Sequence, residues 1–448
     1  MKSGMPGIRA ALARILFGLA ALASLACPAF AESIADAASR IRTGAQLLQV
    51  AGQLIAADRI EDARALVGAW RKSDKTYQYR MLFTEGLIAR KQGDHQRSVG
   101  IFRQILVAEP GFTQVRRELA FSLYLAGDQD GARHQADLLV KAGIDDGQNG
   151  LRSLIRVIDD SRPFQMRFFT SLAPSSNANR GAGSKIIWLG GLPFAIPAER
   201  QKKAGAGLLL GAEMVYRQKF TDTAAFTASM TAQATLNPFE DTALASLDGG
   251  VGIEKRFGDH ALRISAVGRV DLADEGGFYW EAGAAAEAVF KTGAKDRTRL
   301  AARIVRHETN GSDAFDGWKF RADAQHDHVL SPTRFIRGFG AYETDRVNSA
   351  RSSYDEYMAG IGAYNEFSGG YSLYGQLSAA RRIYRAPSFV FGTRKDWRYE
   401  ARMTLTKRDF QIMGLAPQIT YTYTRNNSSD PFEAWDAHGI DVKLTKEF

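Results

Sequence analysis

The larger part of the chain alternates apolar and polar residues over many short segments, and this pattern constrains the fold more than any other feature. Fourteen candidate strands follow one another between Phe164 and Phe448. Most have the roughly 9–11 residues that a tilted strand needs to cross a bilayer. They lie at about 164–172, 205–217, 222–235, 243–256, 259–270, 278–291, 296–308, 318–330, 333–346, 354–367, 371–384, 395–407, 414–425 and 434–448.

The segment 396–406 shows the separation of its two faces most clearly. One face carries Trp397, Tyr399, Ala401, Met403 and Leu405. The other face carries Asp396, Arg398, Glu400, Arg402, Thr404 and Thr406. In a soluble sandwich the charged face would meet the surrounding water, whereas in a membrane barrel it lines a wet lumen and the apolar face meets lipid.

The connections between the strands distinguish these two folds. Long connections at 173–204, 236–242, 271–277, 309–317, 347–353, 385–394 and 426–433 alternate with short turns near Lys219, Gly258, Gly293, Pro332, Gly369 and Asp409. An even up-and-down barrel with its long loops outside gives this alternation. A Greek-key sandwich does not. The sequence therefore predicts a 14-stranded antiparallel transmembrane β-barrel over 162–448.

The last candidate strand has the pattern of the final strand of a bacterial outer-membrane barrel. Ile440, Val442, Leu444 and Phe448 share one face, which only Lys446 interrupts. An apolar face that ends in an aromatic residue is typical of such strands. We therefore expect Phe448 to act as the barrel assembly signal.

The first 31 residues have the features of a secretory signal peptide. A basic start at Lys2, Arg9 and Arg14 precedes the short apolar run 15–26 and a small-residue cleavage site at 29–31. Cys27, the single cysteine, lies before the predicted cut. A lipoprotein signal at Cys27 is the alternative, although residues 24–26 fit a lipidation box poorly. Removing three basic residues from 58 leaves 55 against 49 acidic ones, a balance that does not argue for nucleic acid.

Between the signal peptide and the strands, over 32–161, the apolar residues recur at helical spacing. Gly93-Asp94 recurs as Gly127-Asp128, an offset of 34 residues. A helix–turn–helix period of 34 resembles the tetratricopeptide repeat. Two units at about 77–110 and 111–144, and a degenerate one at about 44–75, predict a periplasmic repeat domain with a concave peptide-binding surface. A small helical bundle without a groove is the alternative.

The polar residues do not form a recognisable active site. His326 and His328 share a strand face with apolar residues, so interfacial histidines are favoured over a shared metal ion. His307-Glu308 and Asp313 flank one long loop, but no nucleophile pairs with them. The lumen-facing charges have mixed signs. We therefore expect a protein that is not an enzyme, with no catalytic, cofactor-binding or metal-binding residues.

One segment, together with the order of the domains, resembles a known family. Phe164 to Asn179 has the sequence FQMRFFTSLAPSSNAN, in which a first strand leads into an exit motif made of Ala173, Pro174, Ser175, Ser176, Asn177 and Asn179. This motif, the preceding helical repeats, the 14 strands and the terminal Phe448 resemble the surface lipoprotein assembly modulator (Slam) family.

The resemblance implies a function that the periodicity does not supply. Members of the Slam family are outer-membrane translocons that move client proteins to the cell surface. Their clients are surface lipoproteins or secreted haem- and iron-acquisition proteins. The resemblance therefore implies a bacterial outer-membrane location, with the helical domain in the periplasm. The implied partners are the client, periplasmic chaperones, the barrel assembly machinery and outer-membrane lipids.

Three other functions fit parts of the sequence. An exopolysaccharide export porin also joins tetratricopeptide repeats to a barrel, but it predicts a longer array and a lumen of one charge sign. An outer-membrane barrel hydrolase lacks its catalytic constellation here. A plain diffusion porin leaves the periplasmic repeats unexplained.

Overall fold

The computed structural model describes residues 41–70, 76–144, 150–189, 191–237, 242–273, 277–388, 391–410 and 415–445. The predicted signal peptide, Cys27 and Phe448 lie outside these residues. Two compact units divide the chain, a helical one that extends to Ile158 and a β unit that begins at Asp159. Within the described ranges no helix is long and apolar enough to cross a membrane.

Helices make up the first unit. In the described residues they are α3 (Gly44–Ala56), α4 (Ile60–Ala69), α5 (Tyr77–Lys91), α6 (His95–Ala108), α7 (Thr113–Leu125), α8 (Gln129–Lys141) and α9 (Leu151–Ser161). Their apolar faces form one continuous core, in which Leu47, Leu66, Phe102 and Leu139 are almost completely buried. A single helix pair has no partner for its apolar face, so stacking of the pairs supplies most of the stability.

The 34-residue repeat is visible in the turns that begin α6 and α8. Gly93 and Gly127 both have positive φ, at 85° and 88°, which glycine adopts without strain. Asp94 then accepts a hydrogen bond from the backbone N–H of Arg97, and Asp128 accepts one from Gly131. Each aspartate is therefore an N-cap of its helix. The predicted tetratricopeptide-like helix pairs are confirmed.

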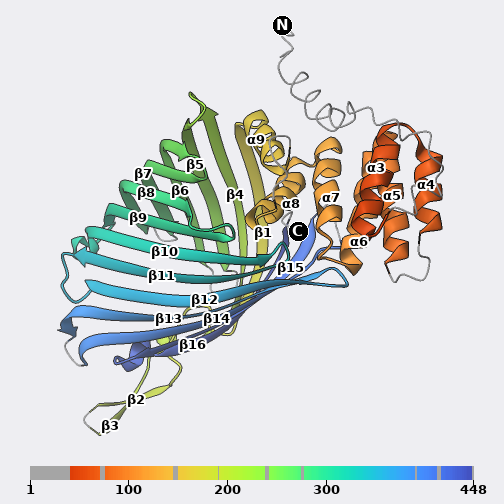
Figure 1. Cartoon of the computed structure of the whole chain (residues 1–448). Coiled ribbons are helices and arrows are strands. Elements are labelled where there is room, and N and C mark those ends of the chain that lie inside the picture. Colours follow the sequence, from red (N-terminus) through yellow and green to blue (C-terminus); the bar gives the residue numbers. More distant parts are fainter. Residues whose placement is uncertain are drawn as a thin grey trace. The chain divides into compact units, whose positions relative to one another are not determined.

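The second unit is a closed antiparallel barrel of 14 strands. Its strands are β1 (Phe164–Ser175), β4 (Gly205–Lys219), β5 (Ala224–Asn237), β6 (Thr242–Phe257), β7 (His260–Ala273), β8 (Phe278–Lys291), β9 (Asp296–Thr309), β10 (Gly317–Ser331), β11 (Arg334–Val347), β12 (Tyr354–Phe367), β13 (Tyr371–Ser388), β14 (Gly392–Lys407), β15 (Ala416–Ser428) and β16 (Trp435–Thr445). Each strand pairs with its neighbour in sequence, and β1 pairs with β16. Figure 1 shows the strands running side by side in chain order. The predicted fold class is confirmed.

The two faces of the barrel wall carry different side chains, as predicted. Outward-facing apolar residues are highly exposed, with Phe168 at 77% and Ile361 at 66%. Inward-facing charged residues pair with one another, as Arg398 does with the buried Glu356 of β12 at 2.8 Å. An apolar outer surface and a polar lumen are the arrangement of a barrel that stands in lipid.

The long loops contain structure that the sequence pattern did not predict. β2 (Ile186–Leu189) and β3 (Leu192–Ala195) form a separate hairpin in the first loop. Short 3₁₀ helices, η2 (Ala198–Arg200), η4 (Asp313–Phe315) and η5 (Pro431–Glu433), lie in three loops. β13 runs four residues beyond its predicted end at 384. After a register shift it continues to pair with β14, as Ser388 opposite Gly392.

Candidate functional site

The exit motif lies where the first and last strands of the barrel meet. Toward β4, every residue of β1 has a partner, including Pro174 opposite Ala206. Toward β16, three β1 residues have partners within the described residues: Ser171, Leu172 and Ser175. Pro174 has no N–H to donate, so a sheet ladder is weakened at that position. Among the described residues the ladder of this seam is therefore interrupted at Ala173 and Pro174, between the pairs of Leu172 and Ser175.

Side chains of the motif bond β16 directly beyond the end of β1. The N–H of Ser176 donates to the carbonyl oxygen of His438 at 2.8 Å, and the N–H of His438 donates back to Ser176 Oγ at 2.9 Å. Asn177 Nδ2 donates to the carbonyl oxygen of Asp436 at 2.9 Å. We call Ser176 and Asn177, with these contacts, the seam clasp.

The two asparagines of the motif also shape the loop that follows. Asn177 is only 2% exposed; its Oδ1 accepts from the N–H of Gly181, and its Nδ2 donates to the Gly181 carbonyl oxygen, both at 2.9 Å. Asn179 Oδ1 accepts from the N–H of Lys203 at 3.0 Å. A Cβ on Gly181 would lie 2.3 Å from the carbonyl oxygen of Gln201, so a side chain there would push the two segments apart.

The lumen-facing charges that the sequence singled out form pairs across and along the strands. Arg321 bonds Asp323 on its own strand at 2.7 Å and Glu343 on β11 at 3.1 Å. Glu356 of β12 accepts from Arg382 at 2.7 Å as well as from Arg398. Each such ion pair provides hydrogen-bond partners for charged groups that the barrel wall partly shields from water. The lumen lining is therefore mixed in sign and internally paired.

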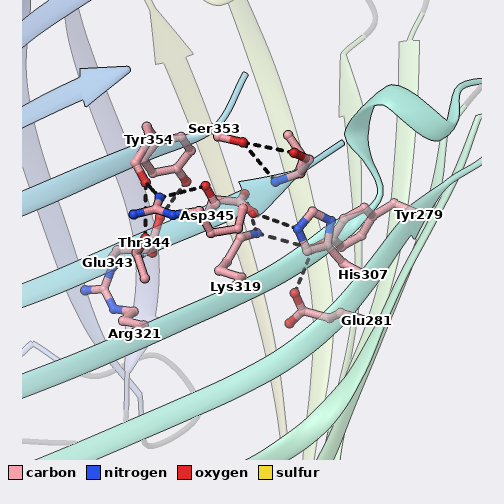
Figure 2. Close-up of polar contacts among 12 residues, drawn as sticks. Tyr279, Glu281, His307, Lys319, Arg321, Glu343, Thr344, Asp345, Ser353 and Tyr354 are labelled. Carbon is pink, nitrogen blue, oxygen red and sulfur yellow. Dashed lines mark hydrogen bonds and ion pairs between the residues drawn. The ribbon is translucent and has the colours of Figure 1, made fainter. Parts of the chain in front are cut away.

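One group of these contacts surrounds a cavity near the long-loop end of the barrel. Figure 2 shows the side chains converging from β8 to β12. His307 Nε2 bonds Asp345 Oδ1 at 2.8 Å, and both residues are buried. Tyr279 donates to Glu281 at 2.7 Å, and Tyr354 donates to Glu343 at 2.6 Å. His307, Asp345, Tyr279 and Tyr354 line a cavity of about 520 Å³ together with Lys319, Tyr384 and Arg394.

The carboxylate partner of His307 comes from a distant part of the sequence. The sequence placed Glu308 and Asp313 near His307, but Glu308 bonds Arg306 at 2.9 Å instead, and Asp345 holds the histidine. His307 Nδ1 is buried and has no hydrogen-bond partner in the described part of the chain. A nucleophilic triad needs a hydroxyl or thiol bonded to that nitrogen. The geometry is that of a buried structural pair.

His326 and His328 lie on the outward face, where the sequence placed them. Asp296 of the neighbouring strand β9 bonds His328 Nδ1 at 2.7 Å and lies 3.5 Å from His326 Nε2. Thr298 bonds the other nitrogen of His326. Among the described residues no group of three or more His, Cys, Asp or Glu is arranged to hold a metal ion. Asp296 was not expected from sequence, because the pairing of β9 with β10 brings it there.

Comparison with known proteins identifies the family. Residues 184–448, more than half of the chain, match the family model described as surface lipoprotein assembly modifier. The chain belongs to this family. The surface lipoprotein assembly modifiers are assembly and transport proteins, and this member is an outer-membrane β-barrel protein.

Two curated relatives match shorter segments. Surface lipoprotein assembly modifier 1 of Haemophilus influenzae is 30% identical over 69 residues, which cover 15% of this chain and 14% of the relative. The surface lipoprotein assembly modifier of Pasteurella multocida is 28% identical over 108 residues, which cover 24% and 21%. The matched segments thus span about a fifth or less of either relative.

Solved outer-membrane barrels resemble this chain only distantly. The outer-membrane expressed OmpT of Vibrio cholerae is 8% identical, with a TM-score of 0.38, over 64% of this chain and 98% of that protein. This likeness adds nothing to the closed barrel that the strand pairing already establishes.

Proposed function

We propose that this chain is an outer-membrane translocon that moves client proteins from the periplasm to the cell surface. The clients would be surface lipoproteins or secreted haem- and iron-acquisition proteins. The observation that carries the proposal is the match of residues 184–448 to the surface lipoprotein assembly modifier family. The proposal requires no bond chemistry from the protein.

In this proposal the helical unit binds partners in the periplasm, and the barrel lies in the outer membrane. The chain enters β1 at Phe164, the end of that strand at which the short turns of the barrel lie. In an outer-membrane barrel the short turns face the periplasm. We therefore place the helical repeats in the periplasm. Stacked helix pairs create extended binding surfaces, which suit contacts with the client, with periplasmic chaperones and with the barrel assembly machinery.

Deletion of the gene tests the proposal. A surface lipoprotein of the same organism is tagged as the candidate client, and its display is measured by protease digestion of intact cells. We expect the tagged protein to be made in normal amount, to be trapped in the periplasm after deletion, and to return to the surface when the gene is restored. A lipoprotein that faces the periplasm is the control, and its amount and location are expected to stay unchanged.

Unchanged display of the tagged protein after deletion contradicts the proposal. If the neighbouring genes encode polysaccharide synthesis and deletion abolishes the surface polysaccharide, the protein is an export porin and not a translocon. The membrane fraction of the restored strain is also probed for the folded barrel. Its presence there shows that the outcome does not reflect a barrel that failed to assemble.

A further inference from the structure

The hairpin of β2 and β3 exposes four large apolar side chains in a loop at the outer end of the barrel. Ile186 is 50% exposed, Trp188 68%, Leu192 63% and Phe194 46%. Apolar residues exposed singly are normal, but four large ones on one short hairpin mark an interaction surface. The group lies outside the strands that cross the membrane, so the barrel's own lipid contacts do not account for it.

Both faces of this hairpin are apolar. Residues directly opposite each other share a face, so Trp188 lies beside Pro193 on one face and Ile187 lies beside Phe194 on the other. A two-stranded sheet in water normally keeps one polar face toward the solvent. In this hairpin Ile187 on one face packs into the protein, but Ile186 and Trp188 on the other face are apolar and exposed, which indicates that this face meets an apolar surrounding.

The base of the hairpin is fixed, so the tip is not free to fold onto its own loop. Ile187 and Ile196 are buried with Ala182 against Phe391 and Phe432. Backbone bonds continue this attachment, because the N–H of Ile196 donates to the Lys185 carbonyl oxygen at 2.9 Å, and that of Gly183 donates to Ala434 at 3.0 Å. The apolar tip is thus held away from the small core at its base.

A salt bridge shows that the loop crosses the barrel rim to the outside. Lys202 Nζ lies 2.8 Å from Asp436 Oδ2. Asp436 shares its strand face with Ile440 and Val442, which are 45% and 44% exposed on the outer surface of β16. In Figure 1 the hairpin stands clear of the barrel wall near β16. The loop therefore returns to the barrel on the outward face of β16, while its apolar tip projects beyond the wall.

The charges around the hairpin favour an anionic partner. The loop segment 181–204 contains four basic residues, Lys185, Arg200, Lys202 and Lys203, and one acidic residue, Glu199. A tryptophan-bearing apolar tip with a basic base is the composition of segments that lie in a membrane interface and bind anionic head groups.

We propose that the β2–β3 hairpin is a lipid anchor that inserts into the outer leaflet beside the seam of β1 and β16. Trp188, Ile186, Leu192 and Phe194 enter the boundary between head groups and acyl chains. Of the basic residues at the base, Lys185 and Lys203 bind lipid phosphates, because Lys202 pairs with Asp436 and Arg200 lies over the Phe432 ring. The anchor holds the first loop, and with it the seam clasp, at the membrane surface.

A fluorescent label at the tip tests the proposal. The full chain carries Cys27→Ser to remove its single cysteine, and Trp188→Cys is labelled with an environment-sensitive dye. The protein is refolded into vesicles of phosphatidylethanolamine and phosphatidylglycerol, with or without a lipid that carries a quencher near its head group. Ala350→Cys, exposed on the loop between β11 and β12, is the matched control.

We expect blue-shifted emission at position 188 that the quencher lipid removes, and unshifted, unquenched emission at position 350. Leu192→Cys repeats the measurement in case Trp188→Cys does not fold. Lys185→Gln with Lys203→Gln is expected to weaken quenching, most strongly at low salt. Equal emission and no quenching at 188, 192 and 350 would overturn the proposal. The proposal would also be overturned if the emission were blue-shifted but not quenched, and only at high protein loading or with client added. Protein, and not lipid, would then cover the tip.

Discussion

Replacing Asn177 with alanine tests whether the seam clasp closes the barrel. Its amide group makes three hydrogen bonds of 2.9 Å in a site that is 2% exposed. Alanine leaves the Asp436 and Gly181 carbonyl oxygens without this donor, whereas the Gly181 N–H keeps a longer bond to Asn179 at 3.2 Å. At about 1 kcal/mol for each net bond, with an added cost for buried groups left unpaired, we expect a loss of about 2–3 kcal/mol in the free energy of unfolding.

This loss is measured by unfolding the full chain with urea in detergent. The folded fraction is read from the heat-dependent electrophoretic mobility of the barrel. With a slope of about 1–3 kcal/mol per molar urea, the midpoint is expected to fall by about 1 M. Asn177→Asp keeps the side-chain volume but points a carboxylate at two carbonyl oxygens, so it is expected to destabilise at least as much.

Asn427→Ala is the matched control for this measurement. Its side chain is exposed and accepts one bond, from Arg425 at 2.8 Å. We expect an effect within about 0.5 kcal/mol. Equal midpoints for Asn177→Ala and Asn427→Ala would refute the argument that the clasp stabilises the seam.

The helical unit gives two further predictions, both measured on the full chain by circular dichroism at 222 nm during urea unfolding. A Cβ on Gly86 would lie 2.6 Å from the buried ring of Phe102, so Gly86→Ala is expected to destabilise the helices by about 1–3 kcal/mol. Gly100, on the same repeat, has open space, so Gly100→Ala is expected to stabilise them by about 0.5–1 kcal/mol; losses of equal size would contradict this. Arg64 binds Glu85 at 2.8 and 3.1 Å, and this hydrogen bond lowers the pKa of Glu85 below 4.5. The pKa of Glu85 is lower in the folded than in the unfolded chain. The pair therefore stabilises the folded helices at pH values above the ordinary carboxylate pKa, and this stabilisation is lost as the pH falls through the lowered pKa of Glu85. Arg64→Gln should therefore cost about 0.5 kcal/mol at pH 7 and progressively less in acid, and a pH-independent cost would contradict the linkage.

The sequence predicted the barrel well because the pleat fixes the period of side chains along a strand. Once Asp396 to Thr406 is a strand, its charged residues must share a face, and the structure places them in the lumen. The ends of strands were less predictable. β13 extends to Ser388 because its partner β14 continues beside it. The length of the strand is thus set by the pairing of the two segments and not by the sequence of either one.

The first loop contains a hairpin signal that the alternation of apolar and polar residues does not reveal. Gly190-Gly191 lies between two apolar runs, which is the composition of a two-residue hairpin turn. The apolar runs 186–189 and 192–195 are each too short to cross a bilayer, so the pattern that predicts membrane strands does not reveal them.

The site contacts could not be predicted because they join residues that are far apart in sequence. Asn177 reaches Asp436, 259 positions away, and His307 reaches Asp345 across two strand pairings. Composition alone indicates that Ser and Asn favour such turns, but not which carbonyl group they bond. The register of β1 against β16 settles that choice, because it places the Asp436 and His438 backbone beside the end of β1.

The position of Pro174 connects these observations. A proline is tolerated in a strand where a ladder bond is absent, and here it lies two residues before Ser176 and three before Asn177, which bond β16. Near the end of β1, side-chain bonds of the motif thus supplement a ladder that is interrupted at Ala173 and Pro174, and closure at this place depends strongly on a few residues of one motif. The other strands of the barrel have no such dependence, since their pairs run through almost every residue. Substitutions in the motif should therefore weaken the seam selectively, whereas comparable substitutions elsewhere in the wall leave the continuous ladders to hold the barrel closed.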